Sequence, residues 1–312
     1  MRLSIIIPCY NEEEVIGKTY ERLKDVVMKN KIKDYEFVFV NDGSMDKTLE
    51  ILASFAKDNK NVKVISFSRN FGHQAAVSAG INECSGDVAV IIDADLQDPP
   101  EVIPEMIELY LKEDANVIYG VRKERKGESI FKKLTAHCFY RVLNMLSEVD
   151  IPLDTGDFRL IDRKVIDTFK NMPERNKFIR GMISWVGFKQ IPFYYTRDPR
   201  LAGKTKYPLA KMIKFAMTGI LYFSKKPLKI AMNLGFFSIL IGLFLSIYTF
   251  VAHFSGIVMT VPGWASTIIT VVFFGGVQLL TIGVLGEYIG NIFDEVKKRP
   301  EYIIDKKLNF EK

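Results

Sequence analysis

The sequence predicts an α/β protein built on a mostly parallel, doubly wound sheet and followed by a membrane anchor. Short apolar runs alternate with helical patterns from Leu3 to Tyr119, which is typical of βα units that build a parallel sheet. Several runs end in polar side chains, at the edge where open α/β sheets bind ligands. From Ile230 to Val296 the chain has no Lys or Arg, which indicates a membrane-embedded region.

Five apolar runs predict the strands. In chain order they are Leu3–Pro8, Glu36–Asn41, Val62–Phe67, Asp87–Ile92 and Ala115–Tyr119. The segments between them have helical patterns and predict helices at Glu12–Lys29, Lys47–Asp58, Gly72–Cys84 and Pro100–Lys112. We expect Asn11 to cap the first helix, because three successive glutamates from Glu12 suit the positive end of a helix dipole.

Two stretches of the uncharged region, at about 230–254 and 264–289, are each long enough to cross a bilayer as a helix. Two buried helices of a soluble core are the disfavoured alternative, because such long uncharged runs rarely follow one another in soluble domains. The connection 253–263 lacks Lys and Arg, whereas basic residues flank the pair, so the positive-inside rule predicts that both termini are cytoplasmic. The flanking residues are Lys225, Lys226, Lys229, Lys297, Lys298 and Arg299.

The segment Tyr207–Phe223 has apolar residues at three- and four-residue steps, which predicts an amphipathic helix. Its position just before a span favours an interfacial helix over one packed on a soluble core. The predicted organisation is a cytoplasmic domain at 1–205, a juxtamembrane segment at 206–229, two spans within 230–291 and a cytoplasmic tail at 292–312.

Composition narrows the class of protein. The net charge of +6 and the pI of about 9 suit a nucleic acid and an anionic membrane equally. Three cysteines without paired spacing indicate a reducing compartment, and we expect no cleaved signal peptide.

No Gly-x-Gly-x-x-Gly follows the first strand and no phosphate loop ends in Gly-Lys-Ser/Thr, which argues against dinucleotide dehydrogenases and P-loop NTPases.

Asp93 and Asp95 directly follow the fourth predicted strand. Two carboxylates there suit a hard divalent cation that carries a diphosphate, because such ions take oxygen ligands and keep positions open for phosphate. An acidic turn is an equally good explanation of Asp-x-Asp alone. In that turn Asp98 would cap the helix begun by Pro99 and Pro100.

Six ordered motifs resemble the family 2 glycosyltransferases of the GT-A fold, and more closely the bacterial polyprenyl-phosphate glycosyltransferases related to dolichol-phosphate mannose synthase. The two-span C-terminus is similar as well, so the resemblance covers nearly the whole chain. The motifs are Ile5-Ile6-Ile7-Pro8-Cys9-Tyr10-Asn11-Glu12, Val40-Asn41-Asp42-Gly43-Ser44, Arg69-Asn70-Phe71-Gly72-His73-Gln74, Asp93-Ala94-Asp95-Leu96-Gln97-Asp98-Pro99-Pro100, Thr155-Gly156-Asp157-Phe158-Arg159-Leu160 and Ala202-Gly203-Lys204-Thr205-Lys206-Tyr207.

The resemblance implies a nucleotide-sugar site in which Asp42 accepts a hydrogen bond from uracil. Without it, Asp42 would be read as a turn residue of Asn-Asp-Gly-Ser. Asp93 would hold the ribose or the donor. The residues implied to bind the nucleotide sugar are Pro8, Tyr10, Asn11, Glu12, Asp42, Asp93, Ala94 and Gln97.

The resemblance also implies the catalytic residues Asp157, Asp95 and Arg122. Asp95 would bind Mg²⁺ or Mn²⁺ on the diphosphate, with Gln97 as a second ligand, and the ion would neutralise charge on the departing UDP. Asp157 lies where the family has its candidate base. A phosphomonoester has a second pKa near 6 and is largely ionised without a base, so an orienting role for Asp157 stays open.

An anionic acceptor beside a diphosphate needs cations, and arginine suits bidentate phosphate contacts. A solvated basic patch near anionic lipids is the alternative for Lys204 and Lys206. His73 is isolated from other ligand types in the sequence, so we expect it to pack at a helix start or to contact the sugar. The candidates for binding the acceptor phosphate are Arg122, Arg159, Arg200, Lys204 and Lys206.

The expected function is inverting transfer of a hexose, glucose as the first choice, from a UDP-sugar to undecaprenyl phosphate at the cytoplasmic membrane face. Galactose, an N-acetylhexosamine, aminoarabinose and mannose from GDP-mannose are alternative sugars. We expect a homo-oligomer, a separate flippase and no nucleic-acid partner. A processive synthase is disfavoured because residues 175–185 do not match Gln-x-x-Arg-Trp and two spans are too few for a channel. A non-catalytic scaffold is disfavoured by the intact acidic motifs.

Overall fold

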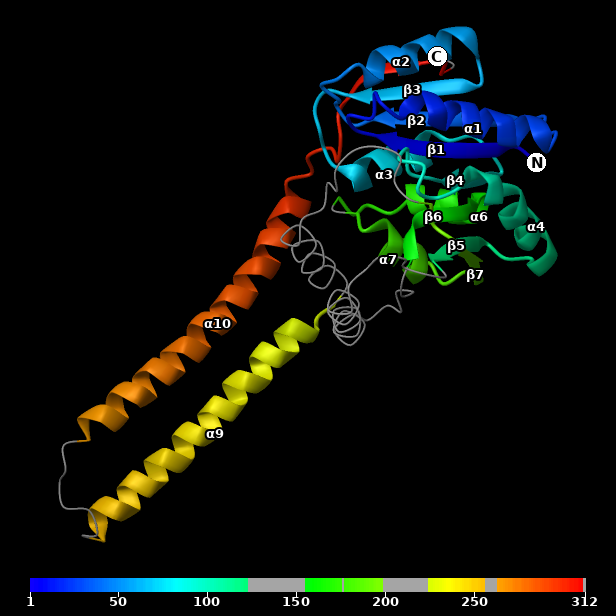
Figure 1. The fold of residues 1–312 in the computed structure, drawn as a ribbon. Coiled ribbons are helices and arrows are strands. Elements are labelled where there is room, and N and C mark those ends of the chain that lie inside the picture. Colours follow the sequence, from blue (N-terminus) through cyan, green and yellow to red (C-terminus); the bar gives the residue numbers. More distant parts are fainter. Residues whose placement is uncertain (123–154, 176, 199–223, 256–262, 311–312) are drawn as a thin grey trace. The chain divides into compact units, whose positions relative to one another are not determined.

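The computed structural model describes residues 1–122, 155–175, 177–198, 224–255 and 263–310. The chain divides into two compact units (Figure 1). The first contains a sheet with its helices and includes the residues from Lys298 onward; the second contains two long helices. The predicted amphipathic segment Tyr207–Phe223 lies outside the described residues.

The first unit is built on an eight-stranded sheet with the order β7-β5-β6-β4-β1-β2-β3-β8. The central strands β4, β1, β2 and β3 run parallel, as predicted. Strand β6 is antiparallel to both β4 and β5, β7 is parallel to β5, and β8 is antiparallel to β3. The strands are β1 (Leu3–Cys9), β2 (Tyr35–Asn41), β3 (Val62–Phe67), β4 (Val88–Ile91), β5 (Val117–Arg122), β6 (Thr155–Asp162), β7 (Gln190–Tyr195) and β8 (Ile304–Leu308).

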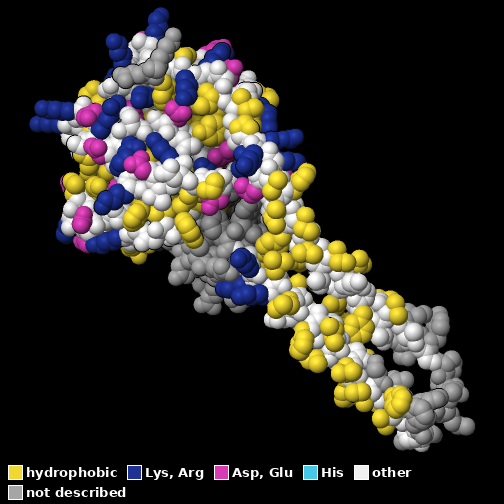
Figure 2. All heavy atoms as spheres, turned by 180° about the vertical axis from the view of Figure 1, so that it is seen from behind, with side chains coloured by type: hydrophobic (Ala, Val, Ile, Leu, Met, Phe, Trp, Pro, Cys, Tyr) yellow, Lys and Arg dark blue, Asp and Glu magenta, His cyan; other side chains and the backbone are white. Residues whose placement is uncertain are grey.

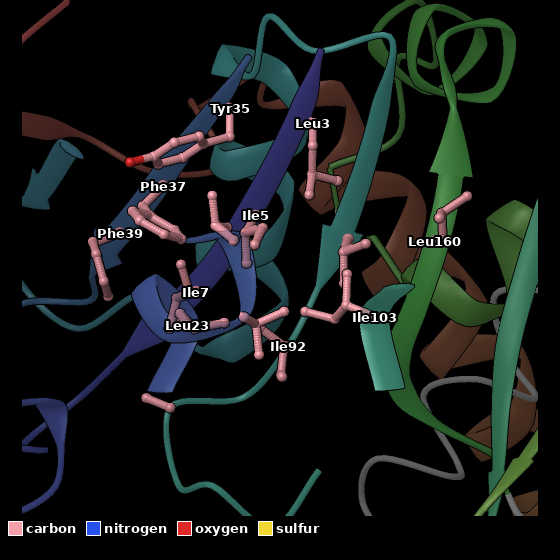
Figure 3. Close-up of a cluster of buried hydrophobic side chains, with 14 of the residues drawn as sticks. Leu3, Ile5, Ile7, Leu23, Tyr35, Phe37, Phe39, Ile92, Ile103 and Leu160 are labelled. Atoms are coloured by element: carbon pink, nitrogen blue, oxygen red, sulfur yellow. The ribbon is translucent and has the colours of Figure 1, made fainter. Parts of the chain in front are cut away.

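Helices cover both faces of this sheet. Leu3, Ile5 and Ile7 of β1 share one face because side chains alternate along a strand, and they pack in one core with Leu23 and Ile103 (Figure 3). On the opposite face, Ile6 lies so close to Gly80 that a Cβ there would be 2.2 Å from Ile6 Cγ2. The helices are α1 (Ile16–Lys29), α2 (Thr48–Asp58), α3 (His73–Glu83), the 3₁₀ turn η1 (Pro100–Val102), α4 (Ile103–Glu113), α6 (Arg163–Lys170) and α7 (Ile179–Trp185).

The prediction that Asn11 caps the first helix is wrong. Helix α1 begins at Ile16, its N-cap position is Val15, and no side chain caps it. Asn11 instead has a left-handed backbone with φ of 51°. Its side-chain Oδ1 accepts a hydrogen bond from Met45 N at 2.9 Å, and its N–H donates to Ser44 Oγ at 3.0 Å. Asn11 therefore joins the loop after β1 to the loop after β2.

The second unit contains the helices α9 (Lys226–Phe254) and α10 (Trp264–Val296). Both are long and apolar enough to cross a membrane, with mean hydropathy of 2.0 over 226–245 and 1.6 over 270–296. Hydrophobic side chains are exposed along them (Figure 2), as expected for helices that contact lipid. Within the unit, Tyr288 Oη donates to the Ser224 carbonyl at 2.6 Å.

Helix α10 continues to Val296, past the predicted span, and the residues after it return to the first unit. Strand β8 pairs with β3, and Asn309 Nδ2 donates to the carbonyls of Ala56 and Val62 at 2.6 and 2.8 Å. The chain therefore leaves the sheet, forms the two-helix unit and ends as an edge strand of the same sheet.

Candidate active site

The loops after β1 and β2 form one connected edge. Asp42 N–H donates to the Cys9 carbonyl at 2.9 Å, and Glu12 N–H donates to Thr48 Oγ1 at 2.9 Å. Gly43 has φ of 65°, and a Cβ on it would lie 2.3 Å from the Arg69 carbonyl carbon, so only glycine fits this turn. The predicted nucleotide residues Pro8 and Tyr10 are at the end of β1, on this edge.

Asp42 is buried and organises the loop that leads into α3. Its carboxylate accepts hydrogen bonds from Phe71 N at 2.7 Å, Gly72 N at 3.0 Å and Asn70 Nδ2 at 2.9 Å. Burial raises the pKa of Asp42, and the two backbone donors partly oppose that rise. The contact with uracil stays a prediction, whereas the internal bonds show that Asp42 holds the start of α3 in place.

Asp157, from β6, is a buried carboxylate at the centre of a charge cluster whose other members are half-buried. Its Oδ1 lies 2.7 Å from Arg180 Nε, and its Oδ2 lies 3.0 Å from His73 Nε2 and 3.4 Å from Gln74 Nε2. Burial would raise the pKa of Asp157, but the Arg180 charge and the His73 hydrogen bond hold it well below its ordinary value. The carboxylate is therefore ionised at neutral pH.

His73 is the first residue of α3, in agreement with the predicted packing at a helix start, and it also contacts Asp157 and the Asp93 motif, which its isolated position in the sequence did not reveal. His73 Nε2 is 3.7 Å from Asp93 Oδ1 and 3.0 Å from Asp157 Oδ2. Burial lowers the pKa of His73, but Asp157 and Asp93 outweigh that effect and raise it to about 9. His73 is a cation at neutral pH, held between two carboxylates from β6 and from the loop after β4.

The Asp93 motif follows β4 in a tight turn in which Leu96 has φ of 55°. Gln97 N–H donates to Asp95 Oδ1 at 3.1 Å, and the Ala94 carbonyl accepts from Thr19 Oγ1 at 2.7 Å. Asp93 Oδ1 is buried without a hydrogen-bond partner. Burial raises the pKa of Asp93 to about 6, and nearby carboxylates add to the rise against the opposing effect of His73.

This turn fits a divalent cation that is bound together with a diphosphate. Among the described residues, no group of three or more His, Cys, Asp and Glu side chains could hold a metal ion by itself. Mg²⁺, however, is commonly bound through one or two carboxylates and substrate phosphates. The hard oxygen donors of Asp95 and Gln97 suit that arrangement, and the orphaned Asp93 oxygen beside them marks a place where a positive charge is favoured.

Asp98 does not cap a helix, so the acidic-turn alternative is wrong on that point. No side chain caps η1, and Asp98 Oδ1 instead accepts from Tyr195 Oη at 2.5 Å and lies 3.4 Å from Arg197 Nε. Burial would lower the pKa of Arg122, but nearby Asp98 and Tyr195 raise it. The carboxylate of Asp98 therefore supports the predicted catalytic arginine from within the core.

Of the predicted arginines, Arg159 lies in β6 with Asp157, and Arg122 lies at the end of the neighbouring strand β5. A Cβ on Gly156 would be 2.8 Å from Arg122 Nη2, so the guanidinium lies directly over that glycine. Arg159 Nη2 donates to the Gly156 carbonyl at 3.0 Å, and burial lowers the pKa of Arg159 to about 10, partly opposed by Asp157. Arg200, Lys204 and Lys206 lie outside the described residues.

Arg180 is the site residue that the sequence did not reveal. It lies in α7, and 23 residues separate it from Asp157. No motif or spacing marks an arginine as the partner of a buried carboxylate. Arg180 reaches Asp157 through the tertiary packing of α7 near β6.

Comparison with known proteins identifies the family. A glycosyl transferase family 2 model matches residues 4–169, and a model of the GtrB C-terminal hairpin matches residues 226–292. The chain belongs to glycosyl transferase family 2. This family 2 glycosyltransferase therefore has a mostly parallel GT-A sheet domain and a C-terminal hairpin of two long apolar helices.

Relatives match the glycosyltransferase over its full length. It is 51% identical to YkcC of Bacillus subtilis (strain 168), an uncharacterized glycosyltransferase, over 100% of this chain and 95% of that protein. It is 41% identical to the SfII prophage-derived bactoprenol glucosyl transferase of Shigella flexneri over 98% of each chain. Among solved structures, it is similar to the mannosyltransferase PcManGT of Pyrobaculum calidifontis in complex with GDP-Man and Mn²⁺, with 15% identity, a TM-score of 0.47 and coverage of 96% and 88%.

Proposed function

We propose that this family 2 glycosyltransferase transfers a hexose, glucose as the first choice, from a UDP-sugar to a polyprenyl phosphate at the cytoplasmic face of the membrane. The observation that carries the proposal is the 41% identity to a bactoprenol glucosyl transferase across sheet domain and hairpin together. The transfer would be a single displacement with inversion at the anomeric carbon. A homo-oligomer and a separate flippase for the product are part of the same proposal.

The return of the chain to the sheet supports the membrane topology. Strand β8 belongs to the sheet that precedes the hairpin, so the two ends of the hairpin must be on the same side of a membrane. An even number of spans meets that requirement. The basic residues Lys225 and Lys229 at the start of α9 and Arg299 after α10 favour the cytoplasm for that side by the positive-inside rule.

We assign Asp157 to orienting the acceptor site rather than to removing a proton. Two cations at 2.7 and 3.0 Å hold its pKa well below the ordinary value, and a carboxylate with so low a pKa is a poor base. The acceptor phosphate, with a second pKa near 6, needs no base at neutral pH. Asp157 would instead hold Arg180 and His73 where phosphate groups approach.

The remaining charges fit the leaving diphosphate. Mg²⁺ or Mn²⁺ held by Asp95 and Gln97 would supply charge neutralisation at the departing UDP. Arg122, supported by Asp98, would add a fixed cation on the β5 side of the site. Asp42 would hold the loop before α3 and would also accept a hydrogen bond from the uracil base.

The experiment is transfer by the purified full-length protein in detergent with undecaprenyl phosphate, Mg²⁺ or Mn²⁺ and labelled sugar nucleotides. We expect a lipid-extractable labelled product with UDP-glucose. Product with UDP-galactose, UDP-N-acetylglucosamine or GDP-mannose instead would replace the sugar assignment. No product with any donor and either metal would contradict the enzymatic proposal and favour a scaffold.

Variants test the role of Asp157 separately. Asp157→Asn and Arg180→Ala should each lower turnover, and the double variant should lose no more than the worse single one, because both act through one contact. Asp167→Asn is the matched control, because Asp167 is an exposed acid on α6 whose carboxylate forms an i,i+4 ion pair with Arg163. Near-normal turnover of Asp157→Asn at saturating lipid would show that Asp157 neither orients the acceptor nor acts as a base.

A further inference from the structure

The chain after α10 inserts one acidic side chain into the sheet domain. Glu301 Oε2 accepts a hydrogen bond from Ser78 Oγ at 2.9 Å and lies 3.6 Å from Lys177 Nζ. The Lys177 side chain is 7% exposed and that of Glu301 is 15% exposed. The ammonium of Lys177 also lies 4.6 Å from the centre of the Phe169 ring. Glu301 is thus the partner of a buried lysine rather than a solvated tail residue.

Further contacts hold the segment around Glu301 in place. The Tyr302 ring stacks on Phe67 at 4.9 Å with an interplanar angle of 13°, and its hydroxyl accepts from Asn82 Nδ2 at 3.1 Å. Ser68 N–H donates to the Ile303 carbonyl at 3.0 Å, just before β8 begins. Tyr302 and Ile303, which follow Glu301, are therefore held against α3 and the end of β3, which fixes the position of the Glu301 backbone.

The two elements that Glu301 joins are the ones that hold Asp157. Ser78 lies in α3, whose first residue is His73, and Lys177 lies two residues before the start of α7, which carries Arg180. The same two elements are also bonded directly, because Ile179 N–H donates to Gln74 Oε1 at 3.0 Å. A shift of α3 against α7 would therefore move His73 and Arg180 relative to the carboxylate between them.

We propose that Glu301 is a positioning residue: with Ser78 and Lys177 it fixes α3 and the start of α7 so that His73 and Arg180 both stay on Asp157. The chain that emerges from the C-terminal hairpin thereby contributes to the active site of the domain that precedes the hairpin. This inference rests on the proposed orienting role of Asp157 for its effect on turnover, although the contact itself is independent of the substrate.

The charge of Glu301 makes a conservative test possible. Burial raises the pKa of Glu301 to about 7, and Lys177 and Ser78 partly oppose that rise. Above pH 7 the carboxylate is the main form, so glutamine removes the ion pair with Lys177 but keeps an oxygen that can accept from Ser78 Oγ. Because the buried ammonium of Lys177 then loses its partner, we expect Glu301→Gln to lower stability as well, and the titration of His73 separates the loss of position from the loss of stability.

The matched control is Glu83→Gln. Glu83 also links α3 to the C-terminal chain, since its Oε1 lies 2.7 Å from Lys307 Nζ. It is at the other end of α3 from His73. General loosening of the C-terminal chain would affect both variants alike, whereas positioning of His73 would be lost only in Glu301→Gln.

The decisive measurement is the titration of His73 by NMR of the histidine-labelled full-length protein in detergent, assigned with His73→Gln. We expect the His73 pKa, raised in the wild type, to move toward its ordinary value in Glu301→Gln and to stay unchanged in Glu83→Gln. Turnover of Glu301→Gln should fall roughly ten- to hundredfold at unchanged KM for the sugar nucleotide, with no further loss when combined with Asp157→Asn.

The outcomes separate the two proposals. An unchanged His73 titration in Glu301→Gln, or turnover lowered equally by Glu83→Gln, would overturn the positioning role. A shifted titration in a protein that transfers no sugar would keep the positioning role and reject the proposed function.

Discussion

Replacing Asp157 by asparagine should destabilise the sheet domain to an extent that depends on pH. The carboxylate has partners at 2.7 and 3.0 Å, and its side chain is only 9% exposed. The rise of the His73 pKa from 6.5 to about 9 corresponds to roughly 3 kcal/mol in favour of the folded, protonated form. Asparagine removes the attraction but also the cost of burying a charge, so we expect a net loss of about 2–3 kcal/mol at pH 6.

The pH dependence has a definite sign. Because the folded pKa of His73 is raised, its contribution is complete below pH 6.5 and is lost as the pH rises through about 9. Because the folded pKa of Asp157 is lowered, its contribution is complete above the ordinary carboxylate value of 3.8 and is lost only in acid. The stability difference between wild type and variant should therefore be greatest between about pH 5 and 6.5 and shrink toward pH 9.

Thermal unfolding of the full-length protein in detergent, followed at one scan rate across this pH range, measures the difference. For a domain of this size, about 2–3 kcal/mol corresponds to a fall in midpoint of roughly 4–12 °C. Asp167→Asn should stay within about 2 °C of the wild type, because its carboxylate is exposed. A midpoint for Asp157→Asn that matches the wild type at pH 6, or a difference that grows toward pH 9, would refute this account of the charge cluster.

Three further substitutions test other contacts. Gly156→Ala should leave the thermal midpoint nearly unchanged yet lower turnover, because its Cβ would displace only the flexible end of Arg122; equal activity would show that this guanidinium position is unimportant. Tyr195→Phe removes the hydroxyl that donates to buried Asp98 and should cost about 1–3 kcal/mol in chemical denaturation, and a neutral result would contradict that bond. Gly80→Ala should destabilise by about 1–3 kcal/mol through overpacking on β1, a loss that calorimetry can detect.

The central part of the fold could be predicted from the sequence, but three strands could not. Strand β6 has Asp157 and Arg159 where an apolar run would be expected. Strand β7 contains Pro192, and β8 reads Ile-Asp-Lys-Lys-Leu, a charged strand at the edge of the sheet. Edge strands tolerate charge and proline because one side needs no partner. The apolar pattern of the two edge strands, β7 and β8, is therefore too weak to predict them.

The candidate site divides in the same way. Motifs at strand ends marked Asp42 and Asp93, because residues that follow parallel strands gather at one edge of the sheet, whereas only the resemblance to the family marked Asp157, which lies within the antiparallel strand β6. The residues that contact these carboxylates could not be predicted from motifs, because they are distant in the sequence. The bonded pair of His73 and Asp157 is separated by 84 residues, and the pair of Ser78 and Glu301 by 223.

By itself, the sequence determined the βα alternation, the polar edge and the two apolar helices, because hydrophobic period and strand-end chemistry are local properties of the chain. Only the tertiary structure decided which cations hold Asp157, what Asp98 and Asn11 bind, and that the last strand closes onto β3. Those contacts join residues distant in sequence, and their energies depend on burial and distance, which no local pattern records.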